Sequence, residues 1–232
     1  MPSLQAKLSP QYISDWASQR VFIPANIKRK AFLRAAGAWF AFGPAGSRNV
    51  ISPSYAALNQ ELHERNKIYG TSGSKWAPKV HELAKILNTK EVLDYGCGKQ
   101  TLAKALADTD LTIKGYDPAL PGMRKQPKPC DIVVCTDVLE HVEPELIDNV
   151  LDDIRRCTRK AAIVTVATRP ANKFLADGRN AHLTVQPLNW WINRFETRFT
   201  VDEVCELPGF EFALLLQPLG ASKLSLNLSD VL

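Results

Sequence analysis

The sequence lacks a hydrophobic run long enough to cross a bilayer, and it has no strong excess of one charge. The longest apolar stretch of the 232-residue chain, Ala31 to Phe42, is about half the length of a membrane span and contains Arg34. The first ten residues lack the basic, apolar and small-residue regions of a secretion signal. A net charge of +5 is too small to indicate a nucleic-acid partner by itself. We therefore expect no membrane partner.

The chain also lacks closely spaced cysteine pairs, internal repeats and low-complexity tracts. Its five cysteines are an odd number, and three of them lie in apolar or glycine-rich runs. This pattern favours reduced thiols in a cytoplasmic protein. With 45% hydrophobic and 23% charged residues the composition is that of an ordinary globular protein.

The length and the hydrophobic pattern predict one main domain with an appendage. A chain of 232 residues is too short for two full α/β domains. Residues 11–62 show no strand alternation and are rich in alanine and aromatic side chains. We predict a helical N-terminal cap over residues 1–75 and a single domain over residues 76–232.

Within the predicted domain, helical and strand patterns alternate as in parallel βαβ units. The predicted strands are Val92 to Tyr95, Leu111 to Tyr116, Asp131 to Thr136 and Ala161 to Ala167, and the predicted helices are Lys79 to Leu87, Gln100 to Ala107, Glu143 to Arg156 and Pro187 to Arg194. Two last apolar runs, Phe199 to Leu207 and Phe210 to Leu216, are separated only by Pro208-Gly209, which indicates a hairpin. The expected fold is α/β, with a Rossmann-like, mostly parallel sheet that ends in an antiparallel hairpin.

The first predicted strand leads into the glycine-rich turn Asp94-Tyr95-Gly96-Cys97-Gly98, which opens a helix. In this context Gly96 and Gly98 let the backbone approach a ligand at the carboxyl edge of the sheet. Asp94 can take a ligand amino group. The third glycine of a dinucleotide fingerprint is absent, which disfavours NAD. A tight structural turn is the alternative reading of the two glycines.

Val92 to Gly98 resembles the first motif of class I S-adenosylmethionine-dependent methyltransferases, and the resemblance extends from about Tyr69 to Leu216. It implies that S-adenosylmethionine is the cofactor and that Asp117, which ends the second strand, binds the ribose hydroxyls. Tyr69 to Gly73 resembles the segment that folds over the methionine end of the cofactor, and Asp137 is a further candidate contact. The thirteen proline-rich residues between Asp117 and Asp131 are too few for the family's usual helix and third strand, so the adenine contacts stay unassigned.

The strand Asp131 to Thr136 is followed by Asp137-Val138-Leu139-Glu140-His141. In a helical turn, Asp137, Glu140 and His141 would share one face at spacings i, i+3 and i+4. The stretch resembles the Glu-x-x-Glu-His motif of ubiquinone-biosynthesis O-methyltransferases and small-RNA 2′-O-methyltransferases. In those families a later histidine, here His182, completes a divalent-metal site, which implies Mg, Mn or Zn.

Other interpretations of these residues stay open. Glu140 or His141 could orient neighbours by hydrogen bonds without a metal, and His182 could act as a general base. Phe174, Leu183, Trp190 and Trp191 near His182 suggest an aromatic platform for a flat acceptor, with core packing as the alternative. Three further residues of the same loop are either substrate contacts or turn residues: Asp177, Arg179 and Asn180.

Missing motifs narrow the reaction. The Asn/Asp-Pro-Pro-aromatic sequence of base N-methyltransferases does not follow this strand, and no Pro-Cys nucleophile of cytosine methylation stands there. We expect O-methylation of a small molecule or nucleotide hydroxyl by His141 or His182, under a lid formed by the cap and the Asn172 to Leu188 loop. The alternatives are methylation of a small amine, and a non-catalytic binding protein using Lys28 to Arg34 as its partner surface. Extended nucleic acid is not the expected partner.

Overall fold

A computed structural model describes residues 49–221 of the chain. The elements are, in chain order, α2 (Pro53–Arg65), the 3₁₀ turn η4 (Ser72–Trp76), α3 (Ala77–Ile86), β1 (Glu91–Tyr95), α4 (Thr101–Ala105), β2 (Thr112–Tyr116), β3 (Cys130–Thr136), the 3₁₀ turns η5 (Leu139–His141) and η6 (Pro144–Leu146), α5 (Ile147–Cys157), β4 (Thr158–Ala167), α6 (Leu188–Phe195), β5 (Phe199–Leu207) and β6 (Glu211–Pro218). The basic segment Lys28 to Arg34 and the apolar stretch to Phe42 lie outside the described residues.

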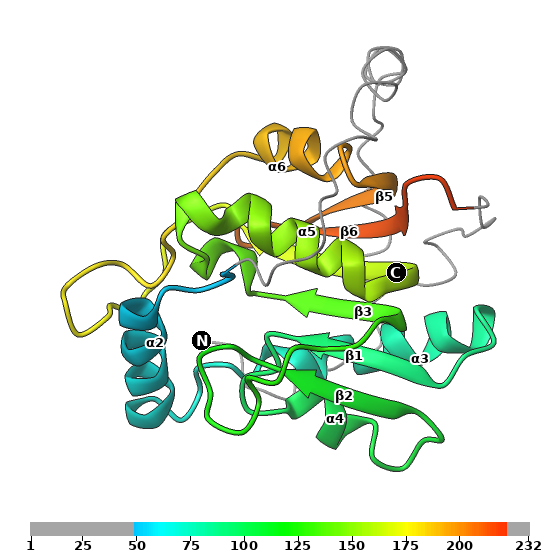
Figure 1. Ribbon diagram of the computed structural model, residues 1–232, viewed down its shortest axis with the longest axis horizontal. Helices are drawn as coiled ribbons and strands as arrows, with labels where there is room; N and C mark the ends of the chain where they lie inside the picture. The colour runs from blue at the N-terminus through cyan, green and yellow to red at the C-terminus, as the bar shows by residue number, and fades with distance from the viewer. Residues whose placement is uncertain (1–48, 222–232) are drawn as a thin grey trace.

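The six strands form one sheet in the order β2-β1-β3-β4-β6-β5. β1 pairs in parallel with β2 and β3, and β3 pairs in parallel with β4. β6 runs antiparallel to both β4 and β5 (Figure 1). The predicted Rossmann-like, mostly parallel sheet with a final hairpin is therefore confirmed. Between β2 and β3 there is neither helix nor strand, as the proline-rich spacing requires.

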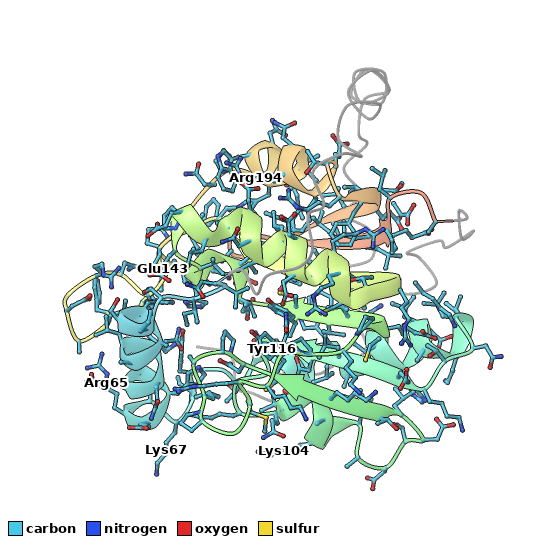
Figure 2. All side chains as sticks on the ribbon, viewed as in Figure 1. Arg65, Lys67, Lys104, Tyr116, Glu143 and Arg194 are labelled. Atoms are coloured by element: carbon cyan, nitrogen blue, oxygen red, sulfur yellow. The ribbon has the colours of Figure 1, made fainter. Side chains whose placement is uncertain are left out.

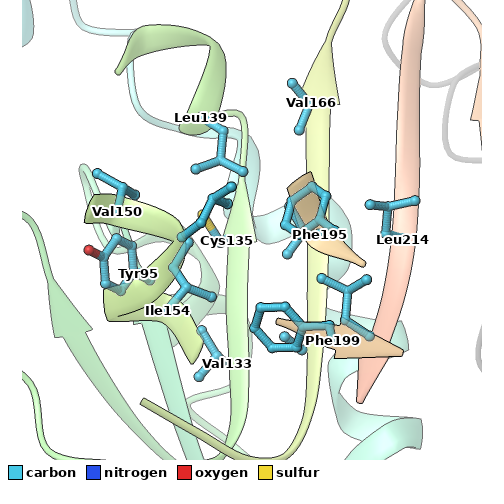
Figure 3. Close-up of a cluster of buried hydrophobic side chains, with 14 of the residues drawn as sticks. Tyr95, Val133, Cys135, Leu139, Val150, Ile154, Val166, Phe195, Phe199 and Leu214 are labelled. Carbon is cyan, nitrogen blue, oxygen red and sulfur yellow. The ribbon is translucent and has the colours of Figure 1, made fainter. Parts of the chain in front are cut away.

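Both faces of the sheet are covered, because successive side chains of a strand point to opposite faces. On one face Val133 packs with Leu151 and Ile154 of α5, and Phe195 of α6 joins the same cluster (Figure 3). On the other face α3 and α4 cover the intervening strand residues, among them Val92. Burial on both sides explains why these strands read as continuous apolar runs.

A third, smaller apolar cluster lies away from the sheet. It joins Tyr55 and Leu62 of α2 to Tyr69 and to Leu175 and Ala181 of the loop after β4. Figure 1 shows α2 beside that loop at the edge of the sheet where the parallel strands end. The described part of the predicted cap is thus α2 and η4. α2 packs in this third cluster, whereas Trp76 of η4 packs with α3 and α4 against the sheet.

The element boundaries differ from the sequence prediction in one informative place. The predicted helix Glu143 to Arg156 begins with the separate turn η6 and becomes α-helical only at Ile147. Among residues 49–221, no helix combines the length and the apolar character that crossing a membrane requires.

Candidate functional site

The carboxyl ends of the four parallel strands open onto one cavity of about 330 Å³. β1 leads to Gly96 and Gly98, β2 to Asp117, β3 to Asp137 and β4 to Arg169, and all five residues line the cavity. Ligands of open α/β sheets bind at this edge. The sequence-predicted site residues therefore converge on one cavity, except Asp94, which is buried at the end of β1 and is not part of the cavity lining.

The two glycines leave no room for a side chain. Gly96 has φ +80°, and a Cβ there would lie 2.3 Å from Cγ2 of Val138. A Cβ on Gly98 would lie 2.7 Å from the carbonyl oxygen of Gly70. The Tyr69 to Gly73 segment therefore folds against the glycine turn, and the backbone of both is open to a ligand.

Backbone N–H groups orient the carboxylate of Asp117. The N–H of Gly98 donates to Oδ2 of Asp117 at 3.2 Å, and the N–H of Ala119 donates to Oδ1 at 3.0 Å. Burial raises the pKa of Asp117, while these N–H groups oppose the shift. Because a carboxylate has about four acceptor positions, Asp117 keeps positions for two hydroxyl donors.

Asp94 is the opposite case, a buried carboxyl group whose pKa no hydrogen bond lowers. Burial, and then the charge of Asp117, raise the pKa of Asp94 to about 7. A cationic ligand group next to Asp94 would lower this pKa again.

The segment that follows β3 departs from the predicted helical turn. Asp137 adopts a left-handed backbone with φ 55°, and its N–H donates to Oγ1 of Thr165 at 3.1 Å. Only Leu139–His141 form a 3₁₀ turn. The prediction that Asp137, Glu140 and His141 share one helical face is therefore wrong, because a left-handed residue reverses the chain direction before the turn begins.

Three of the four predicted metal ligands nevertheless meet. One ligand atom each of Glu140, His141 and His182 lie within 4.8 Å of one another. Asp137 is not a member of this group within the described chain. The rings of His141 and His182 stand edge to face, with centroids 4.7 Å apart. A histidine from the loop after β4 thus meets the two residues after β3.

Backbone carbonyls fix both imidazoles. Nδ1 of His141 donates to the carbonyl oxygen of Ala181 at 2.7 Å, and Nδ1 of His182 donates to that of Arg169 at 2.6 Å. Because a carbonyl only accepts, both nitrogens carry the proton, and each Nε2 keeps its lone pair. This is the arrangement that imidazole ligands and imidazole bases share.

The electrostatics of the cluster keep the two rings neutral. Burial, and then the neighbouring His182, lower the pKa of His141 to about 3, and burial also lowers the pKa of His182. Glu140 is fully buried, and burial followed by the charge of Asp137 raises its pKa well above the usual value. Oε1 of Glu140 accepts from the N–H of Ala167, but Oε2 has no partner. A buried unsatisfied oxygen beside two free ring nitrogens suits a cation.

Comparison with known proteins identifies the family and the fold. A family described as a methyltransferase domain matches residues 64–222. The chain belongs to the class I S-adenosylmethionine-dependent methyltransferase family. No curated protein matches the sequence.

A solved methyltransferase structure shows the same architecture. The 1,6-didemethyltoxoflavin N1-methyltransferase of Burkholderia thailandensis, with bound S-adenosylhomocysteine, has a TM-score of 0.53 at 14% identity and covers 76% of this chain and 94% of its own. The PH0226 protein of Pyrococcus horikoshii OT3 has a TM-score of 0.48 at 14% identity, with coverage of 62% and 90%. The first likeness shows the shared fold.

In this methyltransferase the cavity is roofed by α2, which begins before the family match. Ser52 caps α2 and also contacts the segment after β3, since its N–H and Oγ donate to the two carboxylate oxygens of Glu143 at 2.8 and 2.5 Å. Figure 2 shows Glu143 at the junction of α2 with that segment. From the other side, the N–H of Thr184 donates to the carbonyl oxygen of Glu140 at 2.9 Å. The segment after β3 therefore anchors both parts of the predicted lid.

Sequence reasoning missed the face that α2 turns to the cavity, which carries Tyr55, Asn59 and His63. Their i, i+4 and i+8 spacing is a helical stripe, and this is the signal that could have found them. It also missed Glu143 and Glu211, which line the cavity.

The predicted aromatic platform near His182 is wrong. Trp191 is fully buried in the main core, Phe174 is 58% exposed, and Trp190 stacks with the Arg194 guanidinium at 3.5 Å. None of these three lines the cavity. Aromatic contacts in the cavity come from Tyr55 and Tyr69 instead.

The loop after β4 is stabilised by its own turn residues. Asn180 accepts from the N–H groups of Ala171 and His182 through Oδ1, both at 2.9 Å. Arg179 pairs with Asp177 at 2.7 Å on the exposed side. Asn180 thus positions His182, while Asp177 and Arg179 contact each other.

Proposed function

We propose that this methyltransferase transfers the methyl group to a hydroxyl oxygen of a small molecule or a single nucleotide. The observation that carries the proposal is the pair of neutral imidazoles, His141 and His182, which keep free Nε2 lone pairs and line the same cavity as the glycine turn. A hydroxyl acceptor has a proton to lose, and a neutral imidazole can take it.

The cofactor would lie across the glycine turn. Asp94 would bind the ammonium group of the cofactor. The positive charge of that group would offset the burial that raises the pKa of Asp94. Asp117 would accept from the ribose hydroxyls, and the backbone of Gly96 and Gly98 would pass under the ligand. Tyr69 and Asp137, which line the same cavity, would flank the sulfonium end.

The reaction is then an in-line displacement. An oxygen lone pair forms the new C–O bond while the S–CH₃ bond breaks and its electron pair stays on sulfur as the thioether. The hydroxyl proton moves to Nε2 of His182. His141 and His182 are both half-buried. The His141 ring contacts Tyr69 as well as His182, so we assign the base to His182, whose ring has fewer contacts. Alignment of the three atoms contributes most of the acceleration in such a transfer.

Glu140, His141 and His182 also fit a divalent cation. They offer one carboxylate oxygen and two imidazole nitrogens, a donor set that suits Mg²⁺, Mn²⁺ or Zn²⁺. Bound there, the cation would lower the pKa of a hydroxyl group. The hydrogen bonds to Ala181 and Arg169 orient the two rings for this role as they do for a base.

The enclosure of the site favours a small acceptor. A cavity of about 330 Å³ lies within the size range of small-molecule sites. α2 and the loop after β4 both contribute to its lining, so an acceptor would lie within the cavity and not along an open surface. Binding to duplex DNA or RNA should accordingly be weak and nearly independent of salt.

The test is methyl transfer from labelled S-adenosylmethionine to matched phenols, nucleosides and small amines, with and without Mg²⁺, Mn²⁺ or Zn²⁺. Methyl ethers should form, and His182→Ala should slow their formation by about 100-fold or more. His81→Ala is the matched control, since His81 lies on α3 away from the cavity. The Burkholderia neighbour methylates a nitrogen of its substrate. Transfer to amines alone would therefore overturn the oxygen assignment, and turnover unaffected by a chelator would overturn the metal.

A further inference from the structure

Tyr69 lines the cavity, and both its ring and its hydroxyl group contact neighbouring side chains. Its ring packs against His63 with centroids 4.5 Å apart and meets His141 edge to face at 5.4 Å. Nζ of Lys173 lies 5.8 Å from the ring centroid. The Tyr69 hydroxyl lies 3.3 Å from Nδ1 of His141. Tyr69 thus connects the lid helix to the proposed catalytic imidazole.

The group on α2 that orients this hydroxyl is Asn59. Its side chain is only 8% exposed, and Nδ2 donates to the hydroxyl oxygens of Tyr55 at 3.1 Å and of Tyr69 at 3.4 Å. A buried amide with both hydrogens directed at phenol oxygens is a fixed donor. Asn59 lies outside the family-matched residues, which begin at residue 64.

The directions of these hydrogen bonds give Tyr69 a defined role. Nδ1 of His141 already donates to Ala181, so the Tyr69 oxygen is a second acceptor for the same N–H. A phenol oxygen has two lone pairs, and Asn59 and His141 donate to both. The Tyr69 hydrogen is then left for a ligand in the cavity. Two acceptors on one N–H favour the tautomer with a free Nε2.

We propose that Asn59 is a positioning residue: through Tyr69 it fixes the orientation of the His141 ring, so that the docking of α2 prepares the Glu140–His141–His182 cluster. The inference rests on the proposed function only in treating His141 as a working group. A purely structural Asn59 would stabilise α2 but would leave the His141 ring unchanged.

The experiment is imidazole ¹H–¹⁵N NMR on the full chain with labelled histidine, which gives only four ring systems to assign. In the wild type His141 should show the Nδ1–H tautomer. Asn59→Ala and Tyr69→Phe should each move the His141 ring signals in the same way, and the double variant should add nothing further. Tyr55→Phe is the matched control, because it removes the other phenol that Asn59 contacts. It should leave the His141 signals in place.

A second readout keeps the inference testable if Asn59→Ala fails to fold. The affinities of Asn59→Gln and Tyr69→Phe for Co²⁺ are then compared. Tyr69→Phe loses the orienting contact and should bind Co²⁺ about 10-fold more weakly, whereas Asn59→Gln keeps the amide. Unchanged His141 signals in folded Asn59→Ala, or additive changes in the double variant, would overturn the role of Asn59. Absence of hydroxyl methylation in a wild type whose His141 signals respond to Asn59→Ala would overturn the proposed function and leave this inference supported.

Discussion

The two ends of the cavity hold their polar groups in different ways. At the glycine-turn end, Gly96, Gly98 and Asp117 are arranged by backbone contacts between strands β1 and β2, within one short stretch of chain. At the α2 end, Tyr69 and His141 are arranged by side chains that come from distant elements. The glycine-turn end has no room for an added side chain. At the α2 end, several side-chain contacts together determine how Tyr69 and His141 are oriented. The difference suggests that cofactor binding is set by backbone shape and acceptor chemistry by the docking of α2.

The largest effect should come from adding bulk at the glycine-turn end. Gly96→Val places a Cβ 2.3 Å from Cγ2 of Val138, a stiff β-branched side chain, and blocks the ligand face. We expect S-adenosylhomocysteine affinity to fall by at least about 100-fold, that is by about 2.7 kcal/mol. Calorimetry measures the loss.

The control for backbone strain is Gly220→Val. Gly220 has φ +84°, close to the +80° of Gly96, but a Cβ there meets nothing within 4 Å. It should lower the free energy of unfolding by about 1 kcal/mol and leave ligand affinity unchanged. Equal loss of binding in both variants would mean that backbone strain, and not the shape of the turn, controls the site.

The same contrast explains what the sequence could predict. The turn Asp94 to Gly98 and the succession of strands and helices along the chain follow from local pattern, since strand, turn and helix are contiguous. Asp137 could not be placed, because its left-handed backbone depends on the contact with Thr165 of another strand. Trp191 was wrongly expected near the ligand, because a pair of tryptophans on an amphipathic helix does not show which side faces the core. Asn59 was missed, because its partners are Tyr55 on its own helix and Tyr69 beyond the helix end.

A pH-dependent effect on stability separates the two carboxyl groups of the glycine-turn end. In the free protein the pKa of Asp94 is raised to about 7, above its unfolded value near 4, so the folded state holds an extra proton between these values. Stability of the free protein should therefore fall as pH rises from about 4 to 7 and then level off. A bound ammonium group lowers this pKa, so ligand binding near pH 6.5 should release a proton.

Asp94→Asn tests this pair of statements. The variant should lose the pH-dependent fall in stability and gain of the order of a few kcal/mol at pH 8, because an uncharged amide replaces a buried carboxylate. It should also lose proton release, measured by calorimetry in buffers of different ionisation enthalpy. Asp117→Asn is the comparison, since the N–H groups of Gly98 and Ala119 stabilise its ionised form. Proton release that persists in Asp94→Asn would assign the proton to another group.

The smallest effect should appear at the α2 end, where Ser52 both caps the helix and contacts Glu143. Ser52→Ala removes one hydrogen bond to the start of α2 and one to Glu143. We expect a loss of about 1–2 kcal/mol in the free energy of unfolding. The affinity for S-adenosylhomocysteine should change by less than 3-fold, which corresponds to about 0.6 kcal/mol, because the substitution leaves the glycine turn unchanged.

Ser52→Asp then separates the two roles of Ser52. Aspartate is a good cap but would place a carboxylate against the buried carboxylate of Glu143, so it should destabilise the protein more than alanine does if the contact with Glu143 dominates. If aspartate restores stability, helix capping is the main role of Ser52, and docking of α2 depends on the apolar cluster around Tyr55 and on Asn59 instead.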